Sequence, residues 1–211
     1  MIEFRELRVP NPGILILDLP ENLFTSLKNH VNTQVLERSE FQKRLRKANQ
    51  HLAGHLEEEY TLILDEPFNE FLKELAYEYY EYFDIGKVQR IDDMHSWVNI
   101  QKKIEYNPLH EHHGTLSWVI WIKNPYNLKD EDSLPISANS NLKSNGRFNF
   151  VYSEMTGRIR QHHINLDSSY DGKMVIFPNN LLHQVYPFFT SDEHRISVAG
   201  NIFLSALMRA V

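Results

Sequence analysis

The sequence predicts a mainly β protein with N-terminal helices, in which short strands form a sandwich or a barrel. Helical spacing of apolar residues is confined to about the first 90 positions. From about residue 91 onward, short alternating or apolar segments follow one another between turn residues, without intervening helices, which is typical of sandwiches and barrels. The 211 residues suffice for one buried core. We therefore predict a single domain over 1–211, with supporting helices and short strands in 1–90 and the β core in 91–211.

The N-terminal part is expected to begin with one or two short strands and a helix. The strand segments are IEFRELRVP and GILILDLP, which alternate or run apolar between proline and glycine residues. The spacing then changes, because Leu23, Leu27 and Val31 recur every four residues. Pro20 is well suited to a helix start. This pattern predicts an amphipathic helix whose apolar face carries these three side chains.

Two further helices are expected before the β region. One covers much of 39–60, with Ser39 as its N-cap, although Gly54 and an acidic run weaken its far end. The other has the clearest pattern, because apolar residues keep helical spacing from Phe68 to Phe83. Gly86 is placed to end this last helix.

The β region contains six segments with strand character and one long polar stretch. The stretch 124–145 is rich in asparagine and serine and too long for a tight turn, so we expect a loop that covers a site. The strand segments are MHSWVNIQKKIEY, TLSWVIWI, GRFNFVY, GKMVIF, HQVYPFF and HRISVAGNIFL.

Composition and charge restrict the function. The net charge is −6 with scattered basic residues, so nucleic acid is not expected as a partner. No apolar run approaches the ~20 residues of a membrane span, and acidic and basic residues interrupt the N-terminus where a secretory signal would lie. We therefore expect a soluble, cytoplasmic protein. Because the chain has no cysteine, any metal must bind through nitrogen or oxygen.

Histidines cluster at the entry to the apolar run 107–122, NPLHEHHGTLSWVIWI. Side chains two apart on a strand point to the same face, so His110 and His112 can converge on one ion. A further histidine, His183, follows the apolar run GKMVIFPNNLLHQV. If the two segments are neighbouring strands, the three imidazoles form a facial set that leaves other metal positions open. For the remaining histidines the pattern favours surface or packing roles; these are His30, His51, His55, His95, His162, His163 and His194.

A second feature lies twelve residues after His183 in the segment HRISV. Arg195 and Ser197 share one face of a predicted strand, and the apolar residues between and after them indicate that this strand borders the core. An arginine fork beside a hydroxyl can hold a carboxylate in a bidentate grip. The alternative is a surface salt bridge.

These residues together resemble a known family. The order H-x-H, then GRFNF, then GKMVIFPNNLLHQVYPF, then RIS is similar to the iron(II) and 2-oxoglutarate dependent oxygenases. The likeness is greatest to a branch of small, prolyl-hydroxylase-like oxygenases common in phage and bacteria, and covers roughly residues 95–203. The resemblance implies a double-stranded β-helix, which is a distorted jelly roll with supporting helices. It also implies Fe(II), 2-oxoglutarate and O2 as cofactor and co-substrates.

Carried onto this chain, the resemblance gives His110 and His183 the two histidine ligand roles. Arg195, with Ser197, takes the role of gripping the far carboxylate of 2-oxoglutarate. The family has a carboxylate where this chain has His112, which leaves the ion one negative charge short and should weaken Fe(II) binding. Glu111 is an alternative third ligand, but strand alternation argues against it. The predicted metal ligands are His110, His112 and His183.

Other residues near this set are candidates for holding 2-oxoglutarate or orienting a ligand. We place Asn99 and Tyr106 among the cofactor-binding residues, with Gln101 and Asn107 as further candidates. The three tryptophans could line a substrate pocket, but their apolar strands favour core positions; they are Trp97, Trp118 and Trp121.

The sequence thus predicts an oxygenase, with two rival interpretations. The expected reaction couples oxidative decarboxylation of 2-oxoglutarate to hydroxylation of a C–H bond, with the stretch 124–145 excluding water. The expected substrate is a peptide side chain or a small molecule, and a phage-encoded enzyme would work in the host cytoplasm. One rival is a cupin-like three-histidine metal dioxygenase that does not use 2-oxoglutarate. The other is a non-catalytic jelly-roll binding protein whose histidines are incidental.

Overall fold

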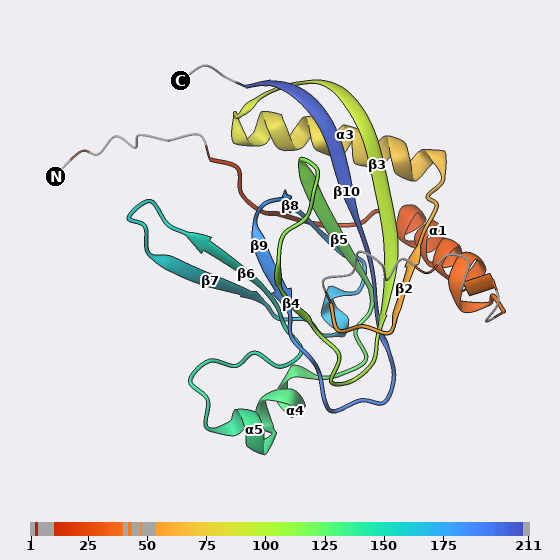
Figure 1. Ribbon diagram of the computed structural model, residues 1–211, viewed down its shortest axis with the longest axis vertical. Helices are drawn as coiled ribbons and strands as arrows, with labels where there is room; N and C mark the ends of the chain where they lie inside the picture. The colour runs from red at the N-terminus through yellow and green to blue at the C-terminus, as the bar shows by residue number, and fades with distance from the viewer. Residues whose placement is uncertain (1–2, 4–10, 40–41, 44–46, 48–53, 209–211) are drawn as a thin grey trace.

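Two antiparallel sheets dominate the structure, a computed structural model that describes residues 3, 11–39, 42–43, 47 and 54–208 (Figure 1). The larger sheet has six strands in the order β1 (Leu15–Asp18), β8 (Lys173–Pro178), β5 (Leu116–Lys123), β10 (Arg195–Met208), β3 (Gly86–Gln101) and β2 (Glu58–Thr61). The smaller sheet has four, in the order β4 (Asn107–His110), β9 (Leu182–Val185), β6 (Phe148–Ser153) and β7 (Ile159–Ile164). The prediction of a mainly β protein is confirmed.

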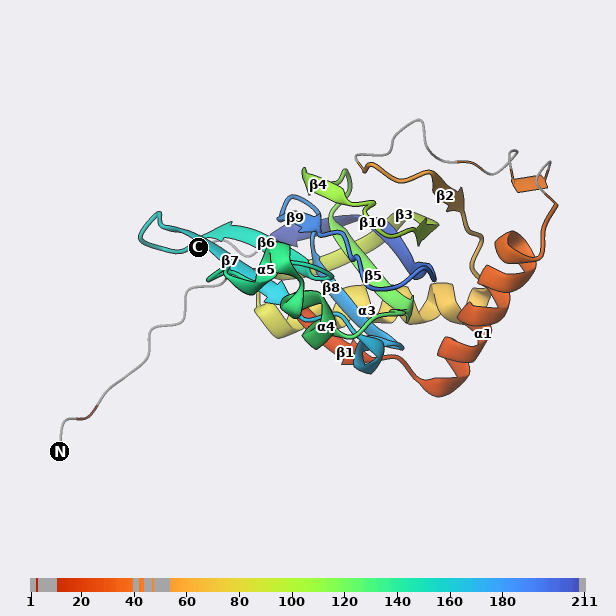
Figure 2. The ribbon, with the colours of Figure 1, turned by 90° about the horizontal axis from the view of Figure 1, so that it is seen from below.

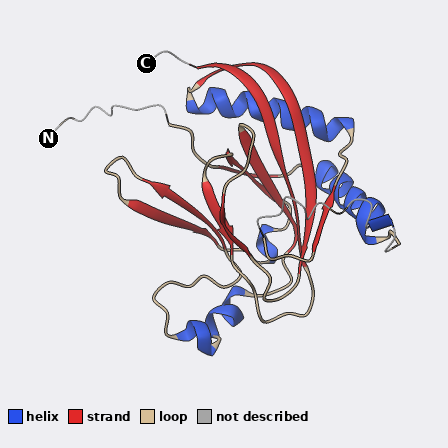
Figure 3. Ribbon diagram, in the orientation of Figure 1, coloured by secondary structure: helices blue, strands red, loops and turns tan. Residues whose placement is uncertain are grey.

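Helices cover the outer face of the larger sheet (Figures 1 and 2). These are α1 (Glu21–Val31), extended by the π-helix η1 (Asn32–Leu36), and the long helix α3 (Glu66–Phe83). Short helices lie elsewhere: α4 (Leu128–Ser133), α5 (Pro135–Ala138) and the 3-10 turn η3 (Ser168–Tyr170). Figure 3 shows that the strands form the centre of the molecule, with helices outside them.

Alternation along each strand divides the core into two layers. On β5, Leu116, Trp118 and Ile120 belong to a cluster that packs against the buried faces of α1 and α3. Val119 and Trp121 point the other way, into a cluster with aromatic side chains of β6 and β8. The six-stranded sheet therefore has one face on the helices and the other toward the smaller sheet, which leaves its inner face free to build a site.

Two of the three predicted helices form as expected. Leu23, Leu27 and Val31 are buried on α1, and α3 covers the pattern from Phe68 to Phe83. This helix ends at Asp84, which adopts the left-handed conformation with φ of 53°, rather than at Gly86. The prediction for 39–60 is wrong at its far end, because 58–60 belong to β2. Half of that predicted helix lies outside the described residues, as does the strand expected over IEFRELRVP apart from Glu3.

The stretch 124–145 differs from the predicted loop. It contains α4 and α5 and is tied to the chain beyond β9, because the fully buried Glu131 accepts hydrogen bonds from Phe189 N and Thr190 N. Asp132 and Arg147 also form an ion pair of 2.7 Å. Strand β7 was not expected either, since its sequence IRQHHI has little apolar character. The part of the chain that the structure describes has no helix long and apolar enough to cross a membrane.

Candidate active site

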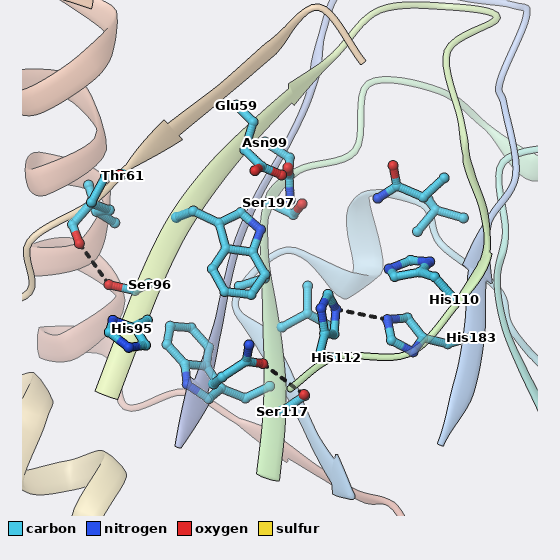
Figure 4. Close-up of a pocket in the computed structure, with 18 of the residues that line it drawn as sticks. Glu59, Thr61, His95, Ser96, Asn99, His110, His112, Ser117, His183 and Ser197 are labelled. Atoms are coloured by element: carbon cyan, nitrogen blue, oxygen red, sulfur yellow. Dashed lines mark hydrogen bonds between the residues drawn. The ribbon is translucent and has the colours of Figure 1, made fainter. Parts of the chain in front are cut away.

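A cavity of about 720 Å³ lies between the two sheets and contains most of the predicted site residues. This volume falls within the ~300–1,000 Å³ of ordinary ligand pockets. The larger sheet supplies residues of β3 and alternate residues of β10, and the smaller sheet and the segment after β4 supply the three histidines. Figure 4 shows the three histidines together on one side and Glu59, Asn99 and Ser197 on another.

Strand pairing brings the predicted metal ligands together. In the β4–β9 ladder, His110 lies opposite His183, and His112 follows two residues after β4 ends. One ligand atom from each ring lies within 4.8 Å of the others. In the described part of the chain, no carboxylate joins this group. Glu111 lines the cavity but lies outside the cluster, which agrees with the alternation expected from the sequence.

Hydrogen bonds fix which ring nitrogen is available on two of these histidines. His110 Nδ1 lies 2.7 Å from the carbonyl of Pro108, and His183 Nδ1 lies 2.9 Å from the carbonyl of Leu181. A carbonyl can only accept, so each Nδ1 carries the proton and each Nε2 keeps its lone pair. His183 Nε2 lies 3.2 Å from His112 Nε2, a separation short enough for a shared proton. Two of the predicted metal ligands are thus held in the tautomer that leaves Nε2 free to bind a metal ion.

Burial keeps all three rings neutral. Desolvation lowers the pKa of His112 to about 4, with smaller effects from His110 and His113. Desolvation also lowers the pKa of His110 and holds the pKa of His183 well below its usual range. His183 is stacked on Phe148 and contacts the ring of Phe177. At neutral pH the cluster therefore offers unprotonated nitrogen donors, the form that binds a metal ion.

The position of His112 depends on the turn between β8 and β9. Asn179 donates its side-chain amide to the His112 carbonyl, and its own carbonyl accepts from His112 N. This pair of hydrogen bonds fixes the chain just after β4, where the ladder to β9 has ended. Asn179, which lies in the segment leading to His183, therefore also fixes the position of the third histidine.

Arg195 lies at the neighbouring edge of the cavity and is 2% exposed. All five of its N–H groups donate to protein acceptors. Nε and Nη2 both donate to Gln101 Oε1, at 3.1 and 2.6 Å. The other three donate to the Tyr126 hydroxyl and to the carbonyls of Gly146 and Tyr186. The guanidinium is therefore a buried cation with a complete set of neutral acceptors, and the alternative of a surface salt bridge is wrong.

The other predicted cofactor-binding residues separate into two groups. Ser197 and Asn99 lie opposite each other in the β10–β3 ladder and both line the cavity. Tyr106 does not belong to this set, because it is 38% exposed and stacks on His55. The chain turns after β3, where Ile104 has a φ of 68°, and carries Tyr106 outward. Gln101 and Asn107 line the cavity, as do all three tryptophans, of which Trp118 and Trp121 are buried as predicted.

Comparison with known proteins identifies the family. Residues 95–201, about half of the chain, match the sequence model of the family described as "Putative 2OG-Fe(II) oxygenase". The chain belongs to this oxygenase family. It is a 2-oxoglutarate-dependent oxygenase, an oxidoreductase that uses Fe(II), 2-oxoglutarate and O2. The matched segment begins in β3 and ends in β10, and so includes the histidine cluster and Arg195. No curated protein matches the sequence.

Solved structures support the fold of the oxygenase. It is similar to a prolyl-4-hydroxylase from Pseudomonas putida, with 13% identity, a TM-score of 0.56, and 90% of this chain and 92% of that chain covered. It is also similar to a prolyl hydroxylase from Trichoplax adhaerens, solved with a hypoxia inducible factor peptide. The identity is 13%, the TM-score is 0.52, and 91% of this chain and 84% of that chain are covered. A third similar structure is a 2OG-Fe(II) family oxidoreductase from Burkholderia pseudomallei. The identity is 11%, the TM-score is 0.50, and 90% of this chain and 84% of that chain are covered. The fold is the double-stranded β-helix that the sequence predicted.

The cavity residues of the oxygenase fit an Fe(II) ion. Three neutral imidazoles converge, two with Nε2 lone pairs fixed by backbone hydrogen bonds. The family match favours the 2-oxoglutarate-dependent interpretation over both rivals.

Sequence reasoning missed one wall of this cavity. Glu59 and Thr61 of β2 line it, followed by the apolar residues 62–64. Glu59 is buried, and its alternation with Tyr60, which packs into the core on the other face of the sheet, is the signal that could have revealed it. The signal was obscured because β2 has only four residues and overlaps the acidic run 57–59, which lies at the weakened far end of the helix predicted over 39–60.

Proposed function

We propose that the oxygenase holds Fe(II) through His110, His112 and His183 and hydroxylates a C–H bond of a peptide side chain or a small molecule. The observation that carries this proposal is the convergence of three neutral histidines in a cavity that also contains a buried arginine. When bound, Fe(II) with 2-oxoglutarate and O2 supplies oxidising chemistry through oxidative decarboxylation of the co-substrate.

The histidines of this chain act by being fixed and uncharged. The carbonyls of Pro108 and Leu181 orient two rings, and Asn179 positions the backbone of the third. Aromatic side chains of β6 and β8 surround His183 and exclude water from it. Because no carboxylate belongs to the cluster in the described residues, we expect weaker Fe(II) binding than a site with one anionic ligand would give.

We assign the far carboxylate of 2-oxoglutarate to Arg195, with Ser197 and Asn99 as further hydrogen-bonding groups. Because every N–H of Arg195 is already engaged, an acceptor must be given up before a carboxylate can bind. Gln101 is the residue expected to yield, since its Oε1 takes two of the five hydrogen bonds. It is a side chain, whereas Gly146 and Tyr186 accept through main-chain carbonyls that the fold fixes.

Water exclusion does not depend on the stretch 124–145, contrary to the sequence-based expectation. None of its residues lines the cavity. Tyr126 instead lies behind Arg195, where its hydroxyl accepts a hydrogen bond and its ring contacts the guanidinium at 5.7 Å. We propose that this segment supports the arginine. A peptide substrate is supported by the Trichoplax adhaerens relative, which was solved with a peptide of hypoxia inducible factor.

The experiment that tests this function uses the purified protein under anaerobic conditions. Fe(II) and 2-oxoglutarate are added together and separately, and the visible absorption band that depends on both is recorded. We expect the band with wild type and its loss in His183→Ala, with His162→Ala as a matched control because His162 is exposed on β7 and lies outside the cavity. Succinate formation in air is then followed. Absence of both the band and succinate in wild type would contradict the proposal.

A further inference from the structure

We propose that Glu59 recognises a basic nitrogen of the substrate, so that the oxygenase acts on a molecule or peptide side chain carrying an ammonium or guanidinium group. This inference rests on the proposed function, because it takes the same cavity as the substrate pocket. It adds a substrate class that neither the family match nor the histidine cluster specifies.

The first observation is the position of Glu59. It is 8% exposed and lines the cavity from β2, the edge strand of the larger sheet. In the β2–β3 ladder it lies opposite Asn99, which in turn lies opposite Ser197 of β10. These three polar residues therefore form a row across three strands on the inner face of the sheet, and Figure 4 shows them together on a different side of the cavity from the three histidines. The Glu59 carboxyl therefore lines the same cavity as the three histidines.

The second observation is that the Glu59 carboxyl forms no hydrogen bond or ion pair with any described residue. Its neighbour on the strand differs, because Glu58 accepts from the Tyr60 hydroxyl and pairs with Lys102. A buried carboxyl without a partner costs several kcal/mol if it is charged. Consistent with this cost, burial alone raises the pKa of Glu59 to about 7.

The third observation is that the described lining residues offer Glu59 no cation. Asn99 Oδ1, Asn107 Oδ1 and Trp118 Nε1 are buried without a hydrogen-bond partner, and these three residues line the same cavity. Arg195 is the only lysine or arginine among the described lining residues, and its five N–H groups are engaged elsewhere. A cation for Glu59 must therefore arrive with a ligand. An ammonium group has three donors and a guanidinium has five, so either could satisfy the carboxylate.

The fourth observation concerns the origin of this wall. Strand β2 lies before residue 95, outside the segment that matches the family. It is held in place by β3, because Leu62 N donates to Ser96 O and the Ser96 hydroxyl donates to Leu62 O. Strand β3 thus holds Glu59 in a fixed wall of the cavity, and such a wall is suited to select a substrate.

The test measures binding of basic probes to the anaerobic enzyme loaded with Fe(II) and 2-oxoglutarate. The probes are N-acetyl-lysine amide, N-acetyl-arginine amide and putrescine, each compared with a neutral partner: N-acetyl-norleucine amide, N-acetyl-citrulline amide and butane-1,4-diol. Calorimetry at pH 7 is carried out in two buffers of different ionisation enthalpy, so that released protons are counted. Wild type is compared with Glu59→Gln, Glu59→Asp and the control Glu58→Gln, which changes the outward-facing carboxyl of the same strand.

We expect at least one basic probe to bind wild type about 10- to 100-fold more tightly than its neutral partner, as for a hydrogen bond to a charged group. Glu59→Gln should remove this preference, whereas Glu58→Gln should keep it and Glu59→Asp should keep part of it. Binding to wild type should release protons at pH 7, because the cation favours the carboxylate, and Glu59→Gln should abolish that release. Thermal unfolding checks that each variant is folded.

Three outcomes would overturn the inference: no basic probe binds wild type, neutral partners bind equally well, or Glu59→Gln keeps the preference. If Glu59 is instead a protonated structural acid, its substitution will leave probe binding unchanged. The absorption band with Fe(II) and 2-oxoglutarate distinguishes the two proposals. Its presence without a preference for basic probes overturns the role of Glu59 alone, and its absence in wild type overturns the proposed function and this inference together.

Discussion

The two ends of the cavity are both buried but have opposite hydrogen-bonding states. At one end, His110 and His183 keep lone pairs that no backbone donor satisfies, and His183 approaches only the ring of His112. At the other end, every donor of Arg195 is satisfied. The metal end is therefore prepared for a ligand in advance, whereas the arginine end must exchange one acceptor for another. The following variants test this difference, from the largest expected effect to the smallest.

Removing one of the clustered histidines should have the largest effect, which is on Fe(II) affinity. His183→Ala and His110→Ala should each weaken Fe(II) binding by about 100-fold or more, because loss of a ligand exceeds the ~10–100-fold effect of losing a group that only orients one. Equilibrium dialysis under anaerobic conditions measures this affinity. His162→Ala should bind like wild type, and retention of tight binding by His183→Ala would exclude the cluster as the metal centre.

Changing Arg195, at the end of the cavity where every donor has an acceptor, should affect stability even without ligands. Arg195→Lys keeps the charge but loses the planar fork, so some of its four acceptor groups remain unpaired. We expect the free energy of unfolding of the metal-free protein to fall by on the order of 3 kcal/mol. Urea unfolding measures it, with Arg160→Lys as the control because Arg160 forms an exposed ion pair with Glu154 worth about 0–1 kcal/mol. Equal loss in both variants would argue against a structural role for Arg195.

Glu59 lines the same cavity without a hydrogen-bond partner among the described residues, and its ionisation predicts a pH effect. Burial raises the pKa of Glu59 to about 7 from an ordinary value of 4.5. Between pH 4.5 and pH 7, Glu59 therefore stays protonated in the folded state but loses its proton in the unfolded state. The contribution of Glu59 to the free energy of unfolding should therefore fall as the pH rises from about 4.5 to 7. The other titratable groups lining the cavity do not contribute to this shift; they are the three clustered histidines, His95, His113, Glu111 and Arg195.

Glu59→Gln isolates that contribution. Its stability relative to wild type should increase by on the order of 2 kcal/mol between pH 5 and pH 8, measured by urea unfolding at both values. Glu58→Gln should show no comparable trend. A constant difference between Glu59→Gln and wild type across this range would show that Glu59 has an ordinary pKa.

Gln101 should control the exchange at the arginine end, with the smallest effect. Gln101→Ala leaves Arg195 with two unused N–H groups, so 2-oxoglutarate should bind about tenfold more tightly, as one or two hydrogen bonds allow. Gln101→Glu places a competing carboxylate on the guanidinium and should weaken binding by at least as much. Anaerobic titration of 2-oxoglutarate into the Fe(II) protein measures both. The two substitutions must change the affinity for 2-oxoglutarate in opposite directions. If both weaken binding, Gln101 instead holds Arg195 in place.

Sequence patterns predicted the parts of the site that depend on strand alternation. Two-residue spacing placed His110 with His112 and Arg195 with Ser197, and the paired strands then brought His183 to the first pair. Contacts between side chains could not be predicted in this way. The contact of Gln101 with Arg195 depends on register between β3 and β10, and the burial of Glu131 depends on a turn far away in the sequence.

Errors arose where short elements gave weak signals. Tyr106 was included because it precedes the histidines, but the left-handed turn at Ile104 directs it outward. Glu59 was overlooked because its strand is brief and acidic. Tyr106 shows that proximity in sequence predicts a site poorly next to a turn. Glu59 shows that alternation within a strand would have predicted the site correctly.

A crystal structure of the anaerobic complex with Fe(II) and 2-oxoglutarate tests the central claim most directly, because it observes both ends of the cavity at once. We expect the ion to be bound by ring nitrogens of His110, His112 and His183. We also expect the far carboxylate of 2-oxoglutarate on Arg195, in place of Gln101 Oε1. An ion bound by Glu111 instead of His112, or 2-oxoglutarate bound away from Arg195 with the Gln101 contact intact, would contradict the account.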